Sequence, residues 1–523
     1  MCGFVFVNEK IQESVFEESL KSIFHRGPDD VREVSLENAR LGFSRLAIMD
    51  LSHAGDQPFE HNGKYYLCNG EIYNYPKLRE ELEFNYKSES DCEVLIPLFE
   101  EEGIPDLLKR IDGEFAFVIY DSTSNSVFAA RDPIGIRPLF YGATAEGKIA
   151  LASEVKALQS FCRDIKAFPP GHYLYDGKIL PYIDVTEVKE YSSHGLELAA
   201  LNINKLLTDA VVKRLNSDAP IGFLLSGGLD SSLVCAIAQR HSDKPIKTFS
   251  IGMTGDAIDL KYAKEVADYI GSDHTEVIIS KDEVLSSIRE VIYHLETFDI
   301  TTIRASLGMY LVCKYIHEKT DIKVLMTGEV SDEIFGYKYT DFAPSPEAFQ
   351  TEAQKRVREL YMYDVLRADR CIAANSLEAR VPFSDTEFVQ YVMALNPELK
   401  MNFSGHGKFL LRKAFEGDYL PESILYREKA AFSDAVGHSM VDYIKEYAAQ
   451  IHPASEVKEI SLRYSHARPF TSESLLFRLI FEEFYPGKSY LVDDFWMPNK
   501  EWENCDVLDP SARVLPNYGA SGA

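Results

Sequence analysis

The stretch that decides the fold is Ile221-Gly222-Phe223-Leu224-Leu225, followed directly by Ser226-Gly227-Gly228-Leu229-Asp230-Ser231-Ser232. The first part is apolar and strand-like, and the second combines two glycines with three hydroxyl groups ahead of a helix-like segment over residues 229–240. Glycine lets the backbone approach an anion, and the N–H groups at the start of a helix favour a phosphate. A carboxylate such as Asp230 beside phosphates indicates a bridging Mg²⁺. Because the stretch has no lysine and lacks the Walker A spacing, it predicts a phosphate loop of another class.

From about Leu196 onward, strand-like and helix-like segments alternate. We expect strands at residues 221–225, 246–251, 274–279 and 323–326, and helices at residues 229–240, 260–270 and 303–318. Such alternation predicts an α/β domain with a parallel sheet and helices on both faces. Ligands of open parallel sheets bind at the carboxyl ends of the strands, which is where the phosphate loop would lie. Beyond Thr327 the sequence predicts a mostly helical C-terminal part.

The chain from Met1 to about Tyr182 has a different pattern. Turn residues separate short strand-like pieces, and helices are few, with residues 91–102 as one candidate. This pattern predicts an α+β domain of layered sheets, with strands at residues 65–68, 115–120, 127–130 and 149–152. Residues 183–195 are polar and aperiodic, which predicts a linker. Since 523 residues are too many for one core, the length predicts two large domains or three smaller ones. The change of pattern favours two, residues 1–185 and 200–523.

The overall charge and the cysteines limit the class of protein. A formal net charge of −27 and an isoelectric point near 5.0 argue against a nucleic-acid partner, because such binding needs clustered Lys and Arg. The eight cysteines are scattered without a C-x-x-C pair, which argues against a zinc site or a disulfide framework. No apolar run approaches the roughly 18 residues that would span a bilayer, and no signal peptide is evident. We therefore expect a cytoplasmic protein with reduced thiols and no membrane partner.

Four motifs together carry a resemblance to a known family. They are Met1-Cys2-Gly3, His25-Arg26-Gly27-Pro28-Asp29, Asn69-Gly70-Glu71-Ile72-Tyr73-Asn74 and the loop that begins at Ser226. The loop resembles the pyrophosphate motif of the ATP pyrophosphatases, and the motifs in this order resemble the glutamine-hydrolysing asparagine synthetases of the B type. The similarity covers nearly the whole chain and looks closest to the eukaryotic form. It implies a glutaminase domain (class II glutamine amidotransferase) of the N-terminal nucleophile hydrolase type, followed by an ATP-pyrophosphatase domain.

Cys2 directly follows the initiator methionine, and its small side chain permits removal of that methionine. The thiol would then share its residue with a free α-amino group of pKa roughly 7.7–8, so the nucleophile would carry its own base. The resemblance implies an oxyanion hole made by the Asn69 side chain and the Gly70 N–H. It also implies a glutamine pocket in which the arginine holds the α-carboxylate and the two acids receive the α-amino group. The residues of that pocket are Arg45, Leu46, Ile48, Asn69, Glu71 and Asp91.

The resemblance places a second site around the phosphate loop, where aspartate is adenylated because its β-carboxylate needs a good leaving group before ammonia can displace it. Glu329 would take a proton from ammonia, and Lys429 would stabilise charge at the α-phosphate. Asp230 and Asp332 would hold Mg²⁺. The residues implied for ATP are Leu224, Ser226, Gly227, Gly228, Asp230, Ser231, Ser232, Ile251, Thr327 and Gly328. Those implied for aspartate are Thr301, Thr302, Arg304 and Asp364.

These motifs predict ATP-dependent synthesis of asparagine, in which ammonia is released from glutamine through a Cys2 thioester, crosses an internal passage and attacks β-aspartyl-AMP. The expected substrates are glutamine, aspartate and ATP, and a homodimer is one expected assembly. Two alternatives stay open: a related amidotransferase that acts on another carboxylate, and a glutamine- or nucleotide-binding regulator whose synthetase half has decayed. Two departures from the family pattern motivate the second alternative. They are Val330, which replaces the usual glycine and would be strained at φ > 0, and the altered segment 339–344.

Overall fold

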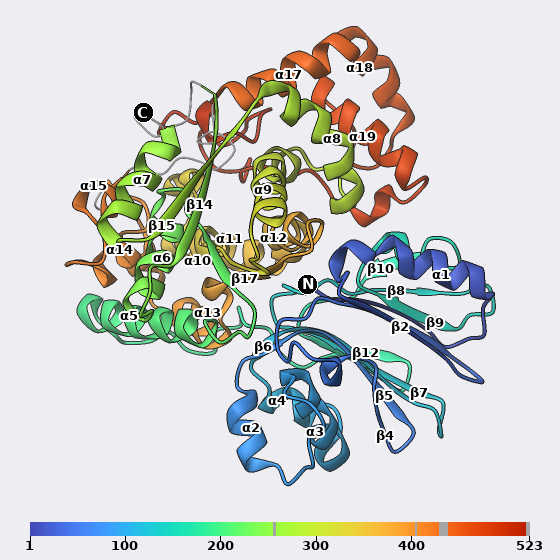
Figure 1. Cartoon of the computed structure of the whole chain (residues 1–523). Coiled ribbons are helices and arrows are strands. Elements are labelled where there is room, and N and C mark those ends of the chain that lie inside the picture. The colour runs from blue at the N-terminus through green and yellow to red at the C-terminus, as the bar shows by residue number, and fades with distance from the viewer. Residues whose placement is uncertain (255–257, 403–404, 428–437, 519–523) are drawn as a thin grey trace.

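The computed structural model describes residues 1–254, 258–402, 405–427 and 438–518. It consists of two bodies packed against each other (Figure 1). The body drawn in blue and teal is rich in strands, and the body that runs from green to red combines a sheet with many helices. We call them the β-rich body and the α/β body.

Two antiparallel six-stranded sheets face each other in the β-rich body. Side chains that alternate along each strand fill the layer between them, where Phe4 and Phe6 meet Leu67 and Val118. The first sheet has the order β10 (Arg163–Ala167), β8 (Phe140–Ala143), β9 (Ile149–Ala152), β1 (Gly3–Val7), β3 (Arg40–Arg45) and β2 (Asp30–Ser35). The second has the order β12 (Lys178–Pro181), β11 (His172–Tyr175), β7 (Ser126–Arg131), β6 (Gly113–Asp121), β5 (Lys64–Ile72) and β4 (Phe59–His61).

Helices cover the outer face of each of these sheets. Phe16 and Leu20 of α1 (Glu13–Ser22) pack on Val5 and Val7 of β1. The second sheet is covered by α2 (Tyr75–Glu81), α3 (Leu95–Glu102) and α4 (Asp106–Arg110). The helix expected at residues 91–102 is present as a 3-10 turn, η3 (Asp91–Val94), that continues into α3. These layers confirm the predicted α+β architecture.

The α/β body is built around a five-stranded parallel sheet. Its order is β15 (Asp273–Ile279), β14 (Lys247–Met253), β13 (Ile221–Leu224), β16 (Val324–Met326) and β17 (Glu378–Arg380). One face packs on α5 (Leu196–Lys213), α6 (Leu229–Arg240) and α7 (Ile258–Ile270), and the other on α8 (Lys281–Leu295), α9 (Ile300–Lys319) and α12 (Asp364–Ala373). The four predicted strands and three predicted helices are therefore confirmed, and so is the parallel sheet with helices on both faces. β17 was not predicted, because three residues carry no readable alternation.

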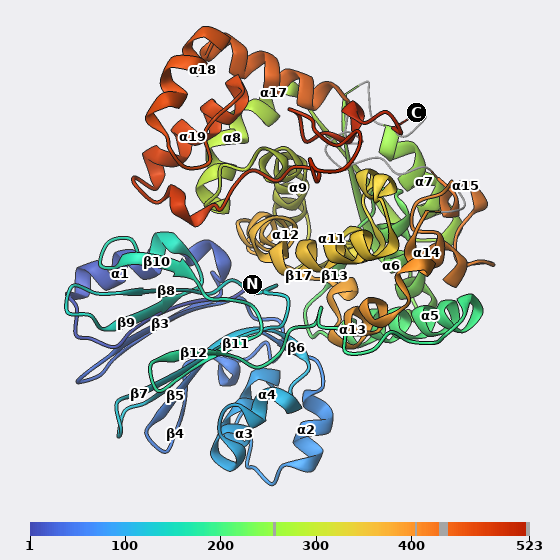
Figure 2. The same ribbon diagram turned by 180° about the vertical axis from the view of Figure 1, so that it is seen from behind.

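The rest of the α/β body is mostly helical, as predicted (Figure 2). Its helices are α10 (Ser331–Phe335), α11 (Pro346–Glu359), α13 (Thr386–Ala394), α14 (Phe409–Ala414), α15 (Glu422–Leu425), α17 (His438–Ile451), α18 (Ala454–Ile460) and α19 (Ser472–Phe484). The predicted linker, residues 183–195, has no helix or strand but is fastened to α11: the Gln354 side chain donates to the Thr186 carbonyl at 2.9 Å, and Arg358 pairs with Asp184 at 3.0 Å. In the described part of the chain, no helix is both long enough and apolar enough to cross a membrane.

Buried ion pairs join the two bodies. Arg26 Nη1 lies 2.7 Å from Glu154 Oε1 in its own body and 2.9 Å from Asp369 Oδ2 on α12. The Nε of Arg26 also donates to the Cys2 carbonyl at 2.8 Å. All three charged side chains are almost fully buried. A buried charge persists only when it is paired, so these contacts fix how the bodies sit on each other.

Replacing Asp369 by asparagine should destabilise the chain by about 3 kcal/mol, because one partner of a buried pair is lost while Arg26 keeps its charge. The measurement is the free energy of unfolding in urea. Asp268→Asn is the matched control, since Asp268 pairs with Lys264 at 2.5 Å on the surface, where a pair contributes about 0–1 kcal/mol. Equal effects of the two variants would contradict a structural role for the buried pair.

Candidate functional site

Cys2 and Asn69 share the layer between the two antiparallel sheets. Phe4 and Phe6 point into this layer, so the alternation along the chain places Cys2 on the same side, and Cys2 does pack on that cluster. Leu67 of β5 also points into the layer, which puts Asn69, two residues later, on the same face. Asn69 is fully buried, and among the described residues neither its Oδ1 nor its Nδ2 has a hydrogen-bond partner.

The thiol itself is held close to the chain start. Cys2 Sγ donates to the Leu46 carbonyl at 3.6 Å, and burial raises the pKa of the thiol to about 11. Met1 is fully buried, and its ammonium donates to the Leu377 carbonyl of the α/β body at 3.1 Å. While Met1 is attached, the Cys2 nitrogen belongs to a peptide bond, so a free amine on the nucleophile requires removal of Met1.

Gly70 lies against β6 with no space for a side chain. A Cβ at this position would come within 2.3 Å of the Glu114 carbonyl oxygen. The side chains of Leu46 and Ile48 pack, with Met49, against Ala219 and Val324 of the α/β body. Cys2 packs on the same cluster, and its thiol donates to the Leu46 carbonyl.

Arg45 ends β3 and is wrapped by the loop that follows it. Its Nη1 donates to Asp56 Oδ1 at 2.5 Å and to the Ser52 carbonyl at 2.6 Å, and its Nη2 donates to the carbonyls of Met49 and Asp50. Its guanidinium thus touches one carboxylate and three carbonyl groups. The loop pre-orients the arginine that the sequence assigns to the glutamine α-carboxylate.

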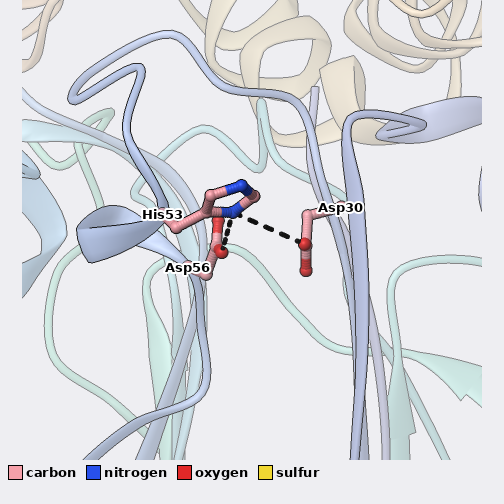
Figure 3. A group of neighbouring side chains, drawn as sticks. All are labelled: Asp30, His53 and Asp56. Atoms are coloured by element: carbon pink, nitrogen blue, oxygen red, sulfur yellow. Dashed lines mark hydrogen bonds and ion pairs between the residues drawn. The ribbon is translucent and has the colours of Figure 1, made fainter.

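Asp30, His53 and Asp56 gather beside this loop, with ligand atoms within 4.8 Å of one another (Figure 3). His53 Nδ1 lies 2.9 Å from Asp56 Oδ2 and 3.8 Å from Asp30 Oδ2. Asp56 also accepts hydrogen bonds from Arg32 Nη2 and Arg45 Nη1, each at 2.5 Å. Because two guanidinium groups already neutralise Asp56, we assign the group to the support of Arg45 and not to a metal ion.

Two buried acids of the set implied for glutamine lie near a buried arginine of the α/β body. Glu71 Oε2 lies 3.0 Å from Arg380 Nη2, and Asp91 Oδ2 accepts from the Ile72 N–H at 2.6 Å. Burial and the nearby carboxylates raise the pKa of Glu71 well above its usual range, and burial raises that of Asp91 to about 6. Glu378 and Arg380 come from β17, so the α/β body supplies part of this site. Sequence reasoning missed Glu378 and Arg380, since both stand more than 300 positions from Glu71 in the sequence.

A cavity of about 270 Å³ opens at the carboxyl ends of the parallel strands. The loop after β13 forms one side, where Ser226 Oγ lies 2.9 Å from Ser231 Oγ. Gly227 has φ of +70°, and a Cβ there would come within 2.5 Å of the Ala263 nitrogen, so the turn requires glycine. The residues of the predicted ATP set that line the cavity are Leu224, Ser226, Gly228, Asp230, Ser231, Ile251, Thr327 and Gly328. Gly227 and Ser232 lie behind the loop surface and do not line it.

Lys408 lies between the two predicted metal ligands and was missed by sequence reasoning. Its Nζ is 2.7 Å from Asp230 Oδ2 and 2.5 Å from Asp332 Oδ1, and it donates to Ser331 Oγ at 3.0 Å. Ser331 Oγ in turn donates to Asp230 Oδ1 at 2.8 Å. Two close carboxylates that face a phosphate loop fit a Mg²⁺ ion, which typically takes one or two carboxylates plus phosphate oxygens. No local pattern around Lys408 signals this position.

Glu329 and Asp364 meet at Arg367, the second residue of this site that sequence reasoning missed. Arg367 Nη2 lies 2.5 Å from Glu329 Oε2 and 2.9 Å from Asp364 Oδ1. Burial raises the pKa of Glu329. Burial also acts on Asp364, but the charge of Arg367 outweighs it and lowers the pKa of that carboxyl. Lys429 lies outside the described residues.

Of the three residues in the segment predicted to bind aspartate, two line the cavity and one is buried at the start of α9. Thr302 is buried, and Asp299 caps α9: its Oδ2 accepts hydrogen bonds from the Thr302 N–H and from the Thr302 hydroxyl, each at 2.7 Å. Thr301 and Arg304 line the cavity. Arg304 is held on both edges by protein carboxylates, those of Glu473 and Asp509.

Val330 adopts φ of +80° and ψ of −21°, a left-handed conformation that is an outlier for a β-branched residue. Its side chain is buried in the apolar core. The altered segment after it is ordered, with the 3-10 turn η5 (Lys338–Phe342) and a buried Tyr339 whose ring stacks on Tyr337 at 5.6 Å. The strain anticipated from the sequence is therefore present, within a packed loop.

Comparison with known proteins agrees with the two bodies. A glutamine amidotransferase domain family matches residues 1–174, and an asparagine synthase family matches residues 202–350 and 341–508. A probable glutamine-hydrolysing asparagine synthetase of Acanthamoeba polyphaga mimivirus is 41% identical over 99% of this chain and 100% of its own length. The glutamine-hydrolysing asparagine synthetase of Homo sapiens is 40% identical over 96% of each chain.

Among solved structures, the glutamine phosphoribosylpyrophosphate amidotransferase from B. subtilis is 15% identical with a TM-score of 0.33, over 54% of this chain and 91% of that one. A likeness this distant carries no argument about function. The full-length relatives do, because they span both bodies at about 40% identity. The chain therefore belongs to the family of glutamine-hydrolysing asparagine synthetases, enzymes that use ATP and glutamine nitrogen to make asparagine from aspartate.

Proposed function

We propose that this chain performs the reaction of its family at two sites, a glutaminase site around Cys2 and a synthetase site around the loop that begins at Ser226. Glutamine and water give glutamate and ammonia at the first site. Aspartate, ATP and ammonia give asparagine, AMP and pyrophosphate at the second. We further propose two domains, residues 1–185 and 200–523, and a passage for ammonia across their interface. We also propose a cytoplasmic location, which is supported by the eight cysteines, all of them free thiols. The homodimer stays a prediction.

The observation that carries the glutaminase proposal is the Asn69 side chain, which is buried without a partner among the described residues. An unsatisfied buried amide costs about 1–3 kcal/mol, and a substrate oxyanion would remove that cost. Asn69 shares a layer with Cys2, so we infer that its Nδ2–H faces the oxyanion formed when the thiolate attacks the glutamine carboxamide. The Gly70 N–H is the proposed second donor.

After removal of Met1, the α-amino group of Cys2 would accept the thiol proton and later donate it to the leaving ammonia. Glu71 and Asp91 are proposed to receive the α-ammonium of glutamine. Their raised pKa values reflect burial first and then repulsion from nearby carboxylates, Glu378 above all, and a bound ammonium would offset that repulsion. Arg45 is proposed to bind the α-carboxylate with the part of its guanidinium that the loop leaves available.

At the synthetase site, the glycines and hydroxyls of the Ser226 loop are proposed to hold the pyrophosphate part of ATP at the start of α6. Asp230 and Asp332 would hold Mg²⁺, which when bound offsets the charge of the departing pyrophosphate. Lys408 lies close to both carboxylates and is proposed to turn its ammonium toward the phosphates when ATP binds. The aspartate β-carboxylate then displaces pyrophosphate from the α-phosphate and forms β-aspartyl-AMP.

Glu329 is proposed to take a proton from ammonia as it attacks the acyl carbon and AMP leaves. Burial raises the pKa of this carboxyl, which suits a group that must accept a proton near neutral pH. Arg367 holds Glu329 at 2.5 Å and so fixes its position. Asp364, on the other side of Arg367, is proposed to contact the substrate ammonium.

The separation of the sites predicts the behaviour of Cys2→Ala. This variant should lose glutamine-dependent asparagine formation by several orders of magnitude and keep ammonia-dependent formation within about twofold, because free ammonia bypasses the thiol. Asparagine is measured with each nitrogen source in turn. Equal loss with both sources would refute Cys2 as the glutaminase nucleophile and point to a folding defect.

The role of Asp230 predicts a complementary pattern. Asp230→Asn should slow aspartate-dependent AMP formation by about 10²-fold or more, since it removes a charge that organises the phosphates. Glutaminase turnover in the same preparation is the control and should persist. Pyrophosphate release by Asp230→Asn at the rate of the unmodified enzyme would refute the proposed role of Asp230. ADP and phosphate as products of the unmodified enzyme would refute adenylation altogether.

The strained Val330 predicts a small effect. The left-handed backbone costs about 1–3 kcal/mol, whereas burial of the valine side chain stabilises by about 1.5–3 kcal/mol, so the two terms oppose each other. Val330→Gly should therefore change asparagine formation from aspartate, MgATP and ammonia by less than about fivefold. An inactive unmodified chain whose activity returns in Val330→Gly would show that the strained loop blocks synthesis.

A further inference from the structure

Residues 505–518, which we call the C-terminal segment, cross the mouth of the synthetase cavity. Pro510, Ser511, Ala512 and Leu515 line that cavity together with the phosphate loop. In both ribbon views the red C-terminal stretch runs from α19 across α9 (Figures 1 and 2). The segment contains only a short 3-10 turn, η11 (Ala512–Val514), so its position depends on its side chains.

Apolar anchors hold the segment at both ends. Cys505 and Leu515 are buried in one cluster with Tyr339, Tyr363 and Trp496. Polar contacts reinforce this packing: Asn517 Nδ2 donates to the Lys338 carbonyl at 2.9 Å. The segment therefore rests on the same altered stretch after Val330 that the cavity uses as a wall.

Between these anchors, Asp509 ties the segment to two helices. Its Oδ1 accepts from Arg304 Nη1 of α9 at 2.8 Å, and its Oδ2 pairs with Lys445 of α17. The Ser511 N–H also donates to Asp509 Oδ1 at 2.8 Å. Burial opposes ionisation of Asp509, but hydrogen bonds and charge from Arg304 outweigh it and hold the pKa of this carboxyl well below its usual range.

Arg304 has little capacity left for a substrate carboxylate. Its Nε donates to Glu473 Oε1 at 2.8 Å and its Nη2 to Glu473 Oε2 at 2.5 Å, which occupies one edge of the guanidinium. Asp509 occupies the other edge, at 2.8 Å and 3.5 Å. The Arg304 side chain is 4% exposed. A guanidinium that already has two carboxylate partners gains little from a third, so Arg304 links α19, through Glu473, to the C-terminal segment, through Asp509.

We propose that Asp509 is a positioning residue: through Arg304 and Lys445 it holds the C-terminal segment as a wall that keeps water from the aspartyl adenylate. This inference rests on the adenylation proposed above. An acyl adenylate that meets water instead of ammonia is hydrolysed: the water oxygen bonds the acyl carbon, the bond from that carbon to the phosphate oxygen breaks, and the water proton is released. The products are aspartate and AMP, so ATP is consumed without asparagine. Exclusion of water is a recognised function of segments that close an active site.

The test compares the pyrophosphate released with the asparagine formed, in the full-length enzyme supplied with aspartate, MgATP and ammonia. The ratio should be near one in the unmodified chain. In Asp509→Asn it should rise by roughly fivefold, the effect of losing one close ion pair, and the KM for aspartate should rise as well. Lys445→Gln, which removes the other partner of Asp509, should give a smaller rise. Asp506→Asn is the matched control, because Asp506 is an exposed acid of the same segment.

A ratio near one in both Asp509→Asn and Lys445→Gln would overturn the proposal. A lower KM for aspartate in Asp509→Asn would also overturn it, because Asp509 would then compete with the substrate for Arg304. Glutaminase activity in each preparation verifies folding, and if Asp509→Asn fails that control, Lys445→Gln decides. Release of ADP and phosphate by the unmodified enzyme would refute adenylation itself, an outcome distinct from any change in the ratio.

Discussion

The contact between the loop after Arg45 and the amino ends of β13 and β16 is the constraint on which the rest of the structure depends. Leu46, Ile48 and Met49 pack on Ala219 and Val324 at the start of these strands. β13 has only four residues, so its two ends lie roughly 10 Å apart at about 3.3 Å per residue. Anything docked at the amino end is therefore only one short strand away from the phosphate loop at the carboxyl end. A short parallel sheet therefore places the proposed thiol site and the proposed phosphate site at its two ends.

The parts of the fold that could be predicted from the sequence are those with a repeating pattern or a glycine requirement. The apolar run before Ser226 and the helices that follow have local causes, and they appear as predicted. The glycines of the loop were recognised as well, and the structure adds that Gly227 needs a positive φ. β17 was not predicted because it is short, and Glu378 and Arg380 were missed with it. Arg380 pairs with Glu378 in the same strand and with Glu71 in the other body. Lys408 and Arg367 were missed because each pairs with a carboxylate distant in sequence, Asp230 for Lys408 and Glu329 for Arg367. Long-range charge pairing leaves no local signal.

Val330 shows how such long-range packing overrides local preference. A left-handed valine conflicts with backbone sterics, yet its side chain is buried among the helices that cover the sheet. The next residue, Ser331, bonds Asp230 across the cavity, so the strained turn directs a hydroxyl at the phosphate loop. Strain of this kind persists where the surroundings fix the backbone, and such positions concentrate at functional sites. The sequence alone shows only that a valine replaces the glycine usual at this position, which favours the alternative of a decayed synthetase half. It does not show that packing holds the valine in the left-handed conformation.

The two arginines predicted to bind substrate carboxylates show what sequence reasoning about a charge cannot resolve. A buried guanidinium must be paired even before substrate arrives, because an unpaired buried charge is strongly destabilising. Arg45 meets this need with one carboxylate and backbone carbonyls, which leaves it positive toward a ligand. Arg304 meets it with two carboxylates, and its charge is compensated by the protein itself. We therefore propose two functions for the same residue type, direct recognition of a substrate by Arg45 and attachment of the C-terminal segment by Arg304, and the number of carboxylate partners separates them.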